Sequence, residues 1–204
     1  MTINSVVTSF RGRRIAVLAA MAAACLLFAA YIPPAAAADG TDRYTMYVPG
    51  QRSNVAGLDS QTNLNSPDCG TDQPLAKIVN TLSRTGGSGT AYLRCGQQAT
   101  FGLRHINYGH GQDWENIRVR YAQPGDWASF MKNTTSANLN IPASNVRYNV
   151  NNTNKDVYTG LLCIRDNTTR NVVRAYDVII PVASDSSNII TSYPTGARAS
   201  DARC

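Results

Sequence analysis

The sequence has few of the residues and motifs on which common enzyme classes depend. It holds two histidines, three lysines and five cysteines in 204 residues. It contains no Gly-x-Ser-x-Gly element and no Walker or dinucleotide-binding glycine motif, which argues against α/β-hydrolase and nucleotide-cofactor enzymes. Because no Cys-x-x-Cys occurs, a zinc ribbon and a thioredoxin-like redox site are also excluded.

Acidic residues are absent from the first 38 positions. Three arginines within residues 11–14 precede an apolar run at 15–31, and small residues follow at 35–38, as in a cleaved secretory signal peptide. The run of about 17 residues is at the lower limit for a membrane span. We therefore expect residues 1–38 to be removed. Residues 39–204 would remain as a single secreted or extracytoplasmic domain, without a stable membrane anchor after processing.

Removal of residues 1–38 lowers the net charge from +6 to about +3, because sixteen basic residues then face thirteen acidic ones. This charge permits binding to a polyanion but does not require it. Thirteen of the sixteen basic residues are arginine, whose planar guanidinium suits bidentate phosphate contacts. A GC-rich genome would also favour arginine, so composition alone does not decide the partner.

Four cysteines remain after the predicted cleavage: Cys69, Cys95, Cys163 and Cys204. An even number in an oxidising compartment predicts two disulfides, with three alternative pairings. We favour Cys69–Cys95 and Cys163–Cys204, since each bond then stays within one half of the chain.

The first two thirds of the mature chain give mixed secondary-structure signals. Residues 39–72 are rich in Gly, Asn, Ser, Asp and Pro, which predicts an extended arm or a long loop. The apolar spacing over 75–82 predicts a helix, and 90–95 a short strand. Alternating apolar and basic residues predict a strand at 117–121, and the polar segment 123–154 a long irregular excursion.

The last third is the clearest region. Residues 157–165, 171–183 and 188–193 are three β-prone runs joined by short turns, which favours an antiparallel meander. The sequence therefore predicts an α+β fold: an N-terminal helical part packed on a C-terminal antiparallel β-meander and stabilised by disulfides.

His105 and His110 are the natural candidates for acid–base chemistry near neutral pH. On a continuous helix, five residues separate them by about 140°, so they would not share a face. A break at Gly109 would let them converge. Either histidine could instead be a structural, hydrogen-bonded residue. Two histidines without an obvious third ligand make a poor metal site, so we predict no metal and no cofactor.

Cleavage of RNA needs little protein machinery, because the 2′-hydroxyl nucleophile belongs to the substrate. An acid, a base and donors to the phosphate are sufficient without a metal. Two segments carry a relevant resemblance: YLRCGQQATFGLRHINYGHGQDW at 92–114 and YDVIIPVASDSSNIITSYP at 176–194. They resemble the Gly-x-Arg-His-Ile segment and the final hairpin of bacterial toxin ribonuclease domains of the barnase–colicin D–RelE type, in the same chain order.

The resemblance implies a role for five residues. His105 would be the general acid or base, Arg104 or Arg118 would contact phosphate, and Thr191 and Tyr193 would position it. This chain departs from such toxins in having its own signal peptide, few lysines and the insertion at 123–154.

A second proton transfer could come from His110, provided that the chain bends at Gly109. The leading hypothesis is thus a secreted, metal-independent endoribonuclease or ribonuclease-like toxin that binds RNA and has an inhibitor (immunity) protein as a further partner. The alternative is a non-enzymatic secreted binding module, such as a protease inhibitor or an envelope-interaction domain. The disulfides, the β-rich C-terminus and long polar loops that could present a contact surface support that alternative.

Overall fold

The computed structural model describes residues 43–51, 69–70 and 72–204. All of them belong to the compact unit Asp39–Cys204. The predicted signal peptide and most of the predicted arm at 39–72 lie outside the described residues.

Within the described residues the fold is α+β, as predicted, with two disulfides. In chain order the elements are β1 (Tyr44–Tyr47), β2 (Ile78–Ser83), β3 (Thr90–Arg94), α1 (Leu103–Arg120), α2 (Trp127–Leu139), η2 (Ala143–Asn145), β4 (Val146–Arg147), η3 (Val150–Asn152), β5 (Lys155–Asp166), β6 (Val172–Ala183) and β7 (Tyr193–Arg198).

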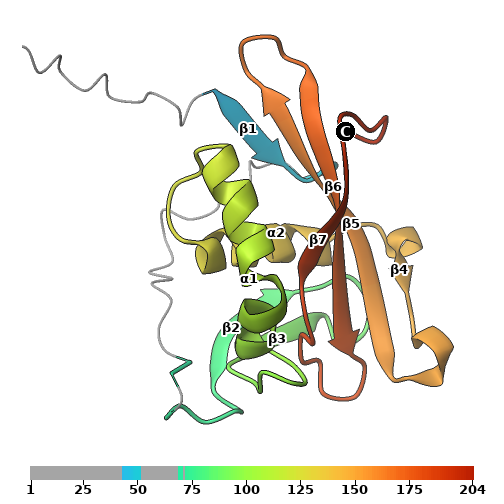
Figure 1. Ribbon diagram of the computed structural model, residues 1–204. Coiled ribbons are helices and arrows are strands. Elements are labelled where there is room, and N and C mark those ends of the chain that lie inside the picture. The colour runs from blue at the N-terminus through green and yellow to red at the C-terminus, as the bar shows by residue number, and fades with distance from the viewer. Residues whose placement is uncertain (1–42, 52–68, 71) are drawn as a thin grey trace, which may run out of the picture. The chain divides into compact units, whose positions relative to one another are not determined.

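A long antiparallel hairpin, β5–β6, forms the centre of the main sheet (Figure 1). The strand order is β1-β5-β6-β7, and β4 pairs with the same edge of β5 as β1. Burial alternates along β6, where Val178, Ile180 and Val182 are fully buried and the residues between them are partly exposed. This two-residue period is that of a strand with one face on the core. The β2–β3 hairpin is a separate two-stranded sheet.

The large apolar residues of helix α1 are three, eight and three positions apart, which places them on one helix face. Leu103, Ile106, Trp114 and Ile117 are all buried. Helix α2 packs against α1, with the rings of Trp114 and Phe130 in edge-to-face contact at 5.7 Å. The two helices together cover the core, and α1 also contacts β7.

Two predictions of secondary structure were wrong in the front half of the domain. Residues 78–83 form strand β2 rather than a helix, because they pair with β3. Residues 117–120 end helix α1 instead of forming a strand: Ile117 and Tyr121 are buried four positions apart, whereas Val119 between them is 60% exposed.

Two further predictions need correction. The segment 123–154 is not irregular throughout, since it contains α2, whose start is capped by Asp126 accepting from the backbone N–H of Ser129 at 2.8 Å. Residues 188–192 make only isolated bridges, and the last strand, β7, begins at Tyr193.

Both predicted disulfide pairings are confirmed. Cys69–Cys95 and Cys163–Cys204 join Cα atoms 5.1 Å and 5.8 Å apart, within the usual range for a disulfide. The two bonds are consistent with an extracytoplasmic location. Among the described residues, no helix has the length and apolar character needed to cross a membrane.

Candidate functional site

The segment that leads into β7 runs along helix α1 (Figure 1). At the start of the helix, the backbone N–H of Gly102 donates to the carbonyl of Ile190 at 3.1 Å. Further along, the indole N–H of Trp114 donates to the carbonyl of Ser192 at 3.0 Å. These two bonds place residues 190–193 beside the helix that carries both histidines.

His110 is held from two directions. Its ring stacks on the ring of Tyr193, with centroids 4.7 Å apart and planes 19° from parallel. Its Nδ1 lies 3.3 Å from Oδ2 of Asp113, one helical turn further on. Since an ionised carboxylate only accepts hydrogen bonds, Nδ1 carries the proton and Nε2 remains to give or take another. The His110 side chain is 27% exposed, so a ligand bound at the surface could exchange a proton with Nε2.

His105 is oriented in the same way by a different acceptor. Its Nδ1 lies 2.8 Å from the carbonyl oxygen of Gln98, which can only accept. Nδ1 therefore donates, and Nε2 of the neutral ring is left with a free lone pair. A ring fixed in this tautomer is suited to act as a general base.

Helix α1 continues without a break through Gly109, so the bend on which convergence of the two histidines depended does not occur. The histidines remain about 140° apart around the helix and about 7.5 Å apart along it. Gly109 has open space where a side chain would stand, and its φ is not positive. The fold itself does not require glycine here. At Gly109 itself, between the two histidines along the helix, no side chain covers the surface.

One flank of α1 carries polar or small residues at successive spacings of four, four, three and four. We call this row the polar stripe: His105, Gly109, Asp113, Asn116 and Arg120. Residues at such spacings are neighbours on one helix face. His105 stands at one edge of the stripe, and His110 borders its other edge through Asp113.

Thr191 is 8% exposed, and its hydroxyl oxygen is buried without a hydrogen-bond partner. Its neighbour Ser192 is turned the other way, toward α2, where the hydroxyls of Ser192 and Thr135 lie 2.7 Å apart. A buried hydroxyl without a partner costs about 1–3 kcal/mol. The Thr191 hydroxyl therefore lies beside the start of α1 without a hydrogen bond.

Arg104 lies on α1 next to His105, but its guanidinium is used within the fold. It donates to the carbonyls of Cys69, Gly96 and Gln73 at 2.8–2.9 Å and also to that of Gly70. These bonds tie the first disulfide loop to the helix. Its predicted contact with phosphate stays a prediction, and the geometry favours a structural role.

Arg118 is also engaged inside the protein. It makes a bidentate pair with Glu115, with both N–O distances at 2.6 Å, and donates to the carbonyl of Gln123 at 2.9 Å. The hydrogen bonds from Arg118 lower the pKa of the Glu115 carboxyl below its ordinary value. The structure does not bring Arg118 into contact with either histidine.

A pocket of about 290 Å³ lies between the polar stripe and β7. Its lining residues are Asp113, Asn116, Ile117, Arg120, Tyr176, Pro194, Thr195, Gly196 and Ala197. Burial raises the pKa of the Tyr176 hydroxyl, with a further rise from the neighbouring Tyr121. Tyr176 is thus a neutral hydrogen-bonding group in the lining of a pocket that is also lined by the Asp113 carboxylate and the Arg120 guanidinium.

Sequence reasoning missed the roles of Asp113, Arg120 and Tyr176 in this region. Asp113 and Arg120 could have been found once residues 103–120 were recognised as one helix, because they then join His105 on one flank. Tyr176 had no such signal, since its position at the pocket depends on the sheet packing against α1.

The described residues contain no group of three or more His, Cys, Asp or Glu that could hold a metal ion. The arrangement offers acid–base chemistry by two histidines, each with one ring nitrogen anchored, and His110 is linked to a polar pocket through Asp113. No family model, no curated protein and no solved structure matches this chain.

Proposed function

We propose that the chain is exported and acts as a metal-independent endoribonuclease, with RNA cleaved by attack of its own 2′-hydroxyl. One observation carries the proposal. His105 and His110 each have Nδ1 bound to an acceptor, so each can present Nε2, and they stand on either side of the bare helix surface at Gly109. In-line displacement at phosphorus places the base and the acid on opposite sides of the phosphate, so the proposal requires both Nε2 atoms to reach one phosphate.

In the proposed reaction, Nε2 of His105 takes the proton of the 2′-hydroxyl. The 2′-oxygen then bonds to phosphorus, and the bond from phosphorus to the 5′-oxygen breaks. His110 gives a proton to that leaving oxygen. The products are a 2′,3′-cyclic phosphate and a free 5′-hydroxyl, so protons and electrons balance without a co-reactant. We assign the acid role to His110 because a carboxylate stabilises an imidazolium better than a peptide carbonyl does.

Two further residues support the phosphate in this proposal. The Thr191 hydroxyl has no partner in the protein, but its oxygen is buried, so donation to a phosphate oxygen would require the segment at 190–192 to shift. Tyr193 keeps the His110 ring in place by stacking. Arg104 and Arg118 have no part in the reaction as we propose it, because both bind groups of the protein itself.

The test is cleavage of RNA by the oxidised mature protein in the presence of a chelator. Positioned acid–base groups are typically worth about 10²–10⁴ in rate, so His105→Ala and His110→Ala should each lower kcat by that factor. Arg147→Ala is the control, since Arg147 is exposed on β4 away from α1. The products should end in a cyclic phosphate, and DNA should resist because it lacks the 2′-hydroxyl.

Intact RNA at high concentrations of folded protein would reject the enzyme and favour the binding module. Undiminished cleavage by a folded His105→Ala protein would remove that histidine from the mechanism.

A further inference from the structure

On the basis of the proposed function, we infer that the pocket between α1 and β7 is the subsite for the nucleotide on the 3′ side of the cleaved bond. The pocket and the acid–base pair share a residue: the Asp113 carboxylate holds Nδ1 of His110 and also lines the pocket. Since His110 protonates the leaving 5′-oxygen, the nucleoside that carries this oxygen must lie on the His110 side of the phosphate. The pocket is on that side.

The lining chemistry fits one nucleotide. Ile117, Pro194 and the Tyr176 ring offer apolar surface to a base, and the side chains of Asn116 and Thr195 can exchange hydrogen bonds with its edge or with ribose. A volume of about 290 Å³ is at the lower end of small-molecule sites, which suits a single unit of a chain.

Arg120 supplies the positive charge at the far end of the polar stripe. It lines the pocket seven residues after Asp113, which is about 10 Å along the helix. It is therefore too far from the histidines to serve the cleaved phosphate. A guanidinium there would meet the next phosphate of the strand, at the 3′ position of the bound nucleotide.

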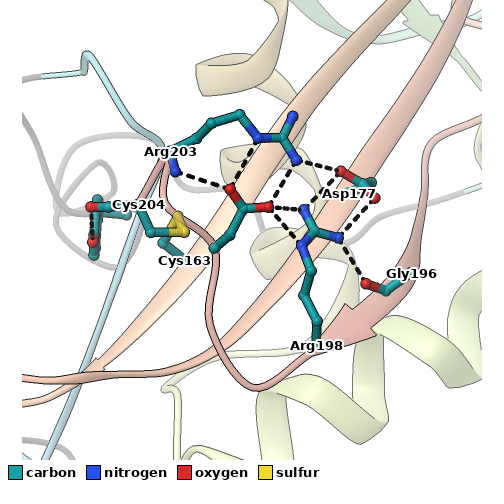
Figure 2. Close-up of a disulfide and its surroundings, with 8 residues drawn as sticks. Cys163, Asp177, Gly196, Arg198, Arg203 and Cys204 are labelled. Atoms are coloured by element: carbon teal, nitrogen blue, oxygen red, sulfur yellow. Dashed lines mark hydrogen bonds and ion pairs between the residues drawn. A yellow bond between two sulfur atoms is a disulfide. The ribbon is translucent and has the colours of Figure 1, made fainter.

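The wall of the pocket is fixed before any ligand binds. Gly196 of β7 has φ +59°, and a Cβ there would stand 2.7 Å from Oδ2 of Asp177. Arg198 donates to the carbonyl of Gly196 at 2.8 Å and pairs with both carboxylate oxygens of Asp177 (Figure 2). The same arginine bonds Asp201. A wall held in this way loses little conformational freedom on binding, which favours affinity.

The experiment is calorimetric titration of the oxidised mature protein with the four nucleoside 3′-monophosphates. These probes place a base, a ribose and a 3′-phosphate in the proposed subsite without a bond to cleave. We expect at least one of them to bind. Arg120→Ala should weaken it about tenfold by loss of a charge-assisted contact, and Thr195→Val should weaken it by a smaller factor. Arg147→Ala is the matched arginine control and should not change the affinity.

The two proposals can fail separately. His105→Ala should leave nucleotide binding unchanged while it removes cleavage. Binding without cleavage in the wild type would reject the ribonuclease and retain the pocket as a nucleotide-binding site only. Cleavage of RNA together with affinities that Arg120→Ala and Thr195→Val leave unchanged would overturn the subsite. Absence of binding by all four probes would overturn it as well.

Discussion

At each end of the polar stripe a disulfide and an arginine fix the neighbouring segment, but the two arginines bind different kinds of acceptor. Near His105, the Cys69–Cys95 disulfide is accompanied by Arg104, whose guanidinium binds backbone carbonyls. Near the pocket, the Cys163–Cys204 disulfide is accompanied by Arg198, whose guanidinium binds carboxylates. Carbonyl acceptors do not titrate and carboxylates do. The end near His105 should therefore keep its geometry over a wide pH range, whereas the end near the pocket depends on ionised carboxylates.

Separate removal of the two disulfides should have the largest effect. Loops of 26 and 41 residues each contribute about 3–4 kcal/mol to the free energy of unfolding through the unfolded chain. The losses in stability should therefore be similar, but the functional losses should differ. The Cys69→Ser/Cys95→Ser protein should lose mainly RNA cleavage, and the Cys163→Ser/Cys204→Ser protein mainly nucleotide affinity. Urea unfolding would measure the stability, cleavage assays the activity on RNA, and calorimetry the nucleotide affinity. Equal functional losses in both variants would remove the distinction between the ends.

Arg104→Met should have the next largest effect. It leaves four carbonyls without their charged donor, and bonds of this type are individually worth about 1.5–3 kcal/mol before water replaces them. We expect a net loss of about 2–3 kcal/mol in urea unfolding. Arg118→Met on the same helix is the control and should cost about 1 kcal/mol or less, because its pair with Glu115 is partly exposed. A larger loss for Arg118→Met would contradict this assignment of roles.

Acidification should produce the smallest effect, at the carboxylate-bound end. Hydrogen bonds from Arg203 and Arg198 hold the pKa of Asp201 well below its ordinary value of 3.8. A carboxyl with a lowered pKa contributes stability that is present above its ordinary value and lost as pH falls below it. Stability should therefore decline below about pH 3.8, and Asp201→Asn should flatten that decline. Urea midpoints at pH 3 and pH 6 test this; an unchanged pH dependence in Asp201→Asn would exclude Asp201 as its source.

The parts of the fold that could be predicted depended on short-range rules. The cysteine pairing followed from placing each bond within one half of the chain, and β5 and β6 followed from their β-branched runs between turns. Helix α1 was not predicted, and its end was taken for a strand because Ile117 and Tyr121 fit a strand period as well as a helical one. Helix α2 was not predicted because its buried face includes the polar residues Thr134 and Asn138, which interrupt the apolar pattern in the sequence.

The candidate site was harder to predict than the fold. His105 and His110 could be selected from residue type and Tyr193 from the resemblance, and the structure places His110 and Tyr193 in contact. The use of Arg104 and Arg118 inside the protein could not be inferred from sequence, since their acceptors are main-chain carbonyls or a carboxylate whose position depends on the folded chain. Arginine is a good phosphate ligand and an equally good structural donor, and only the surroundings distinguish the two roles.

Gly109 has a consequence for how far this protein could be stabilised. A glycine inside a helix costs about 0.5–1 kcal/mol relative to alanine, and the space beyond Gly109 would accept a methyl group. A selection for heat resistance alone would replace it. If the open space at Gly109 admits the substrate, a selection for turnover would retain the glycine. The residue is therefore a place where thermal tolerance and activity would be expected to trade against each other in directed evolution.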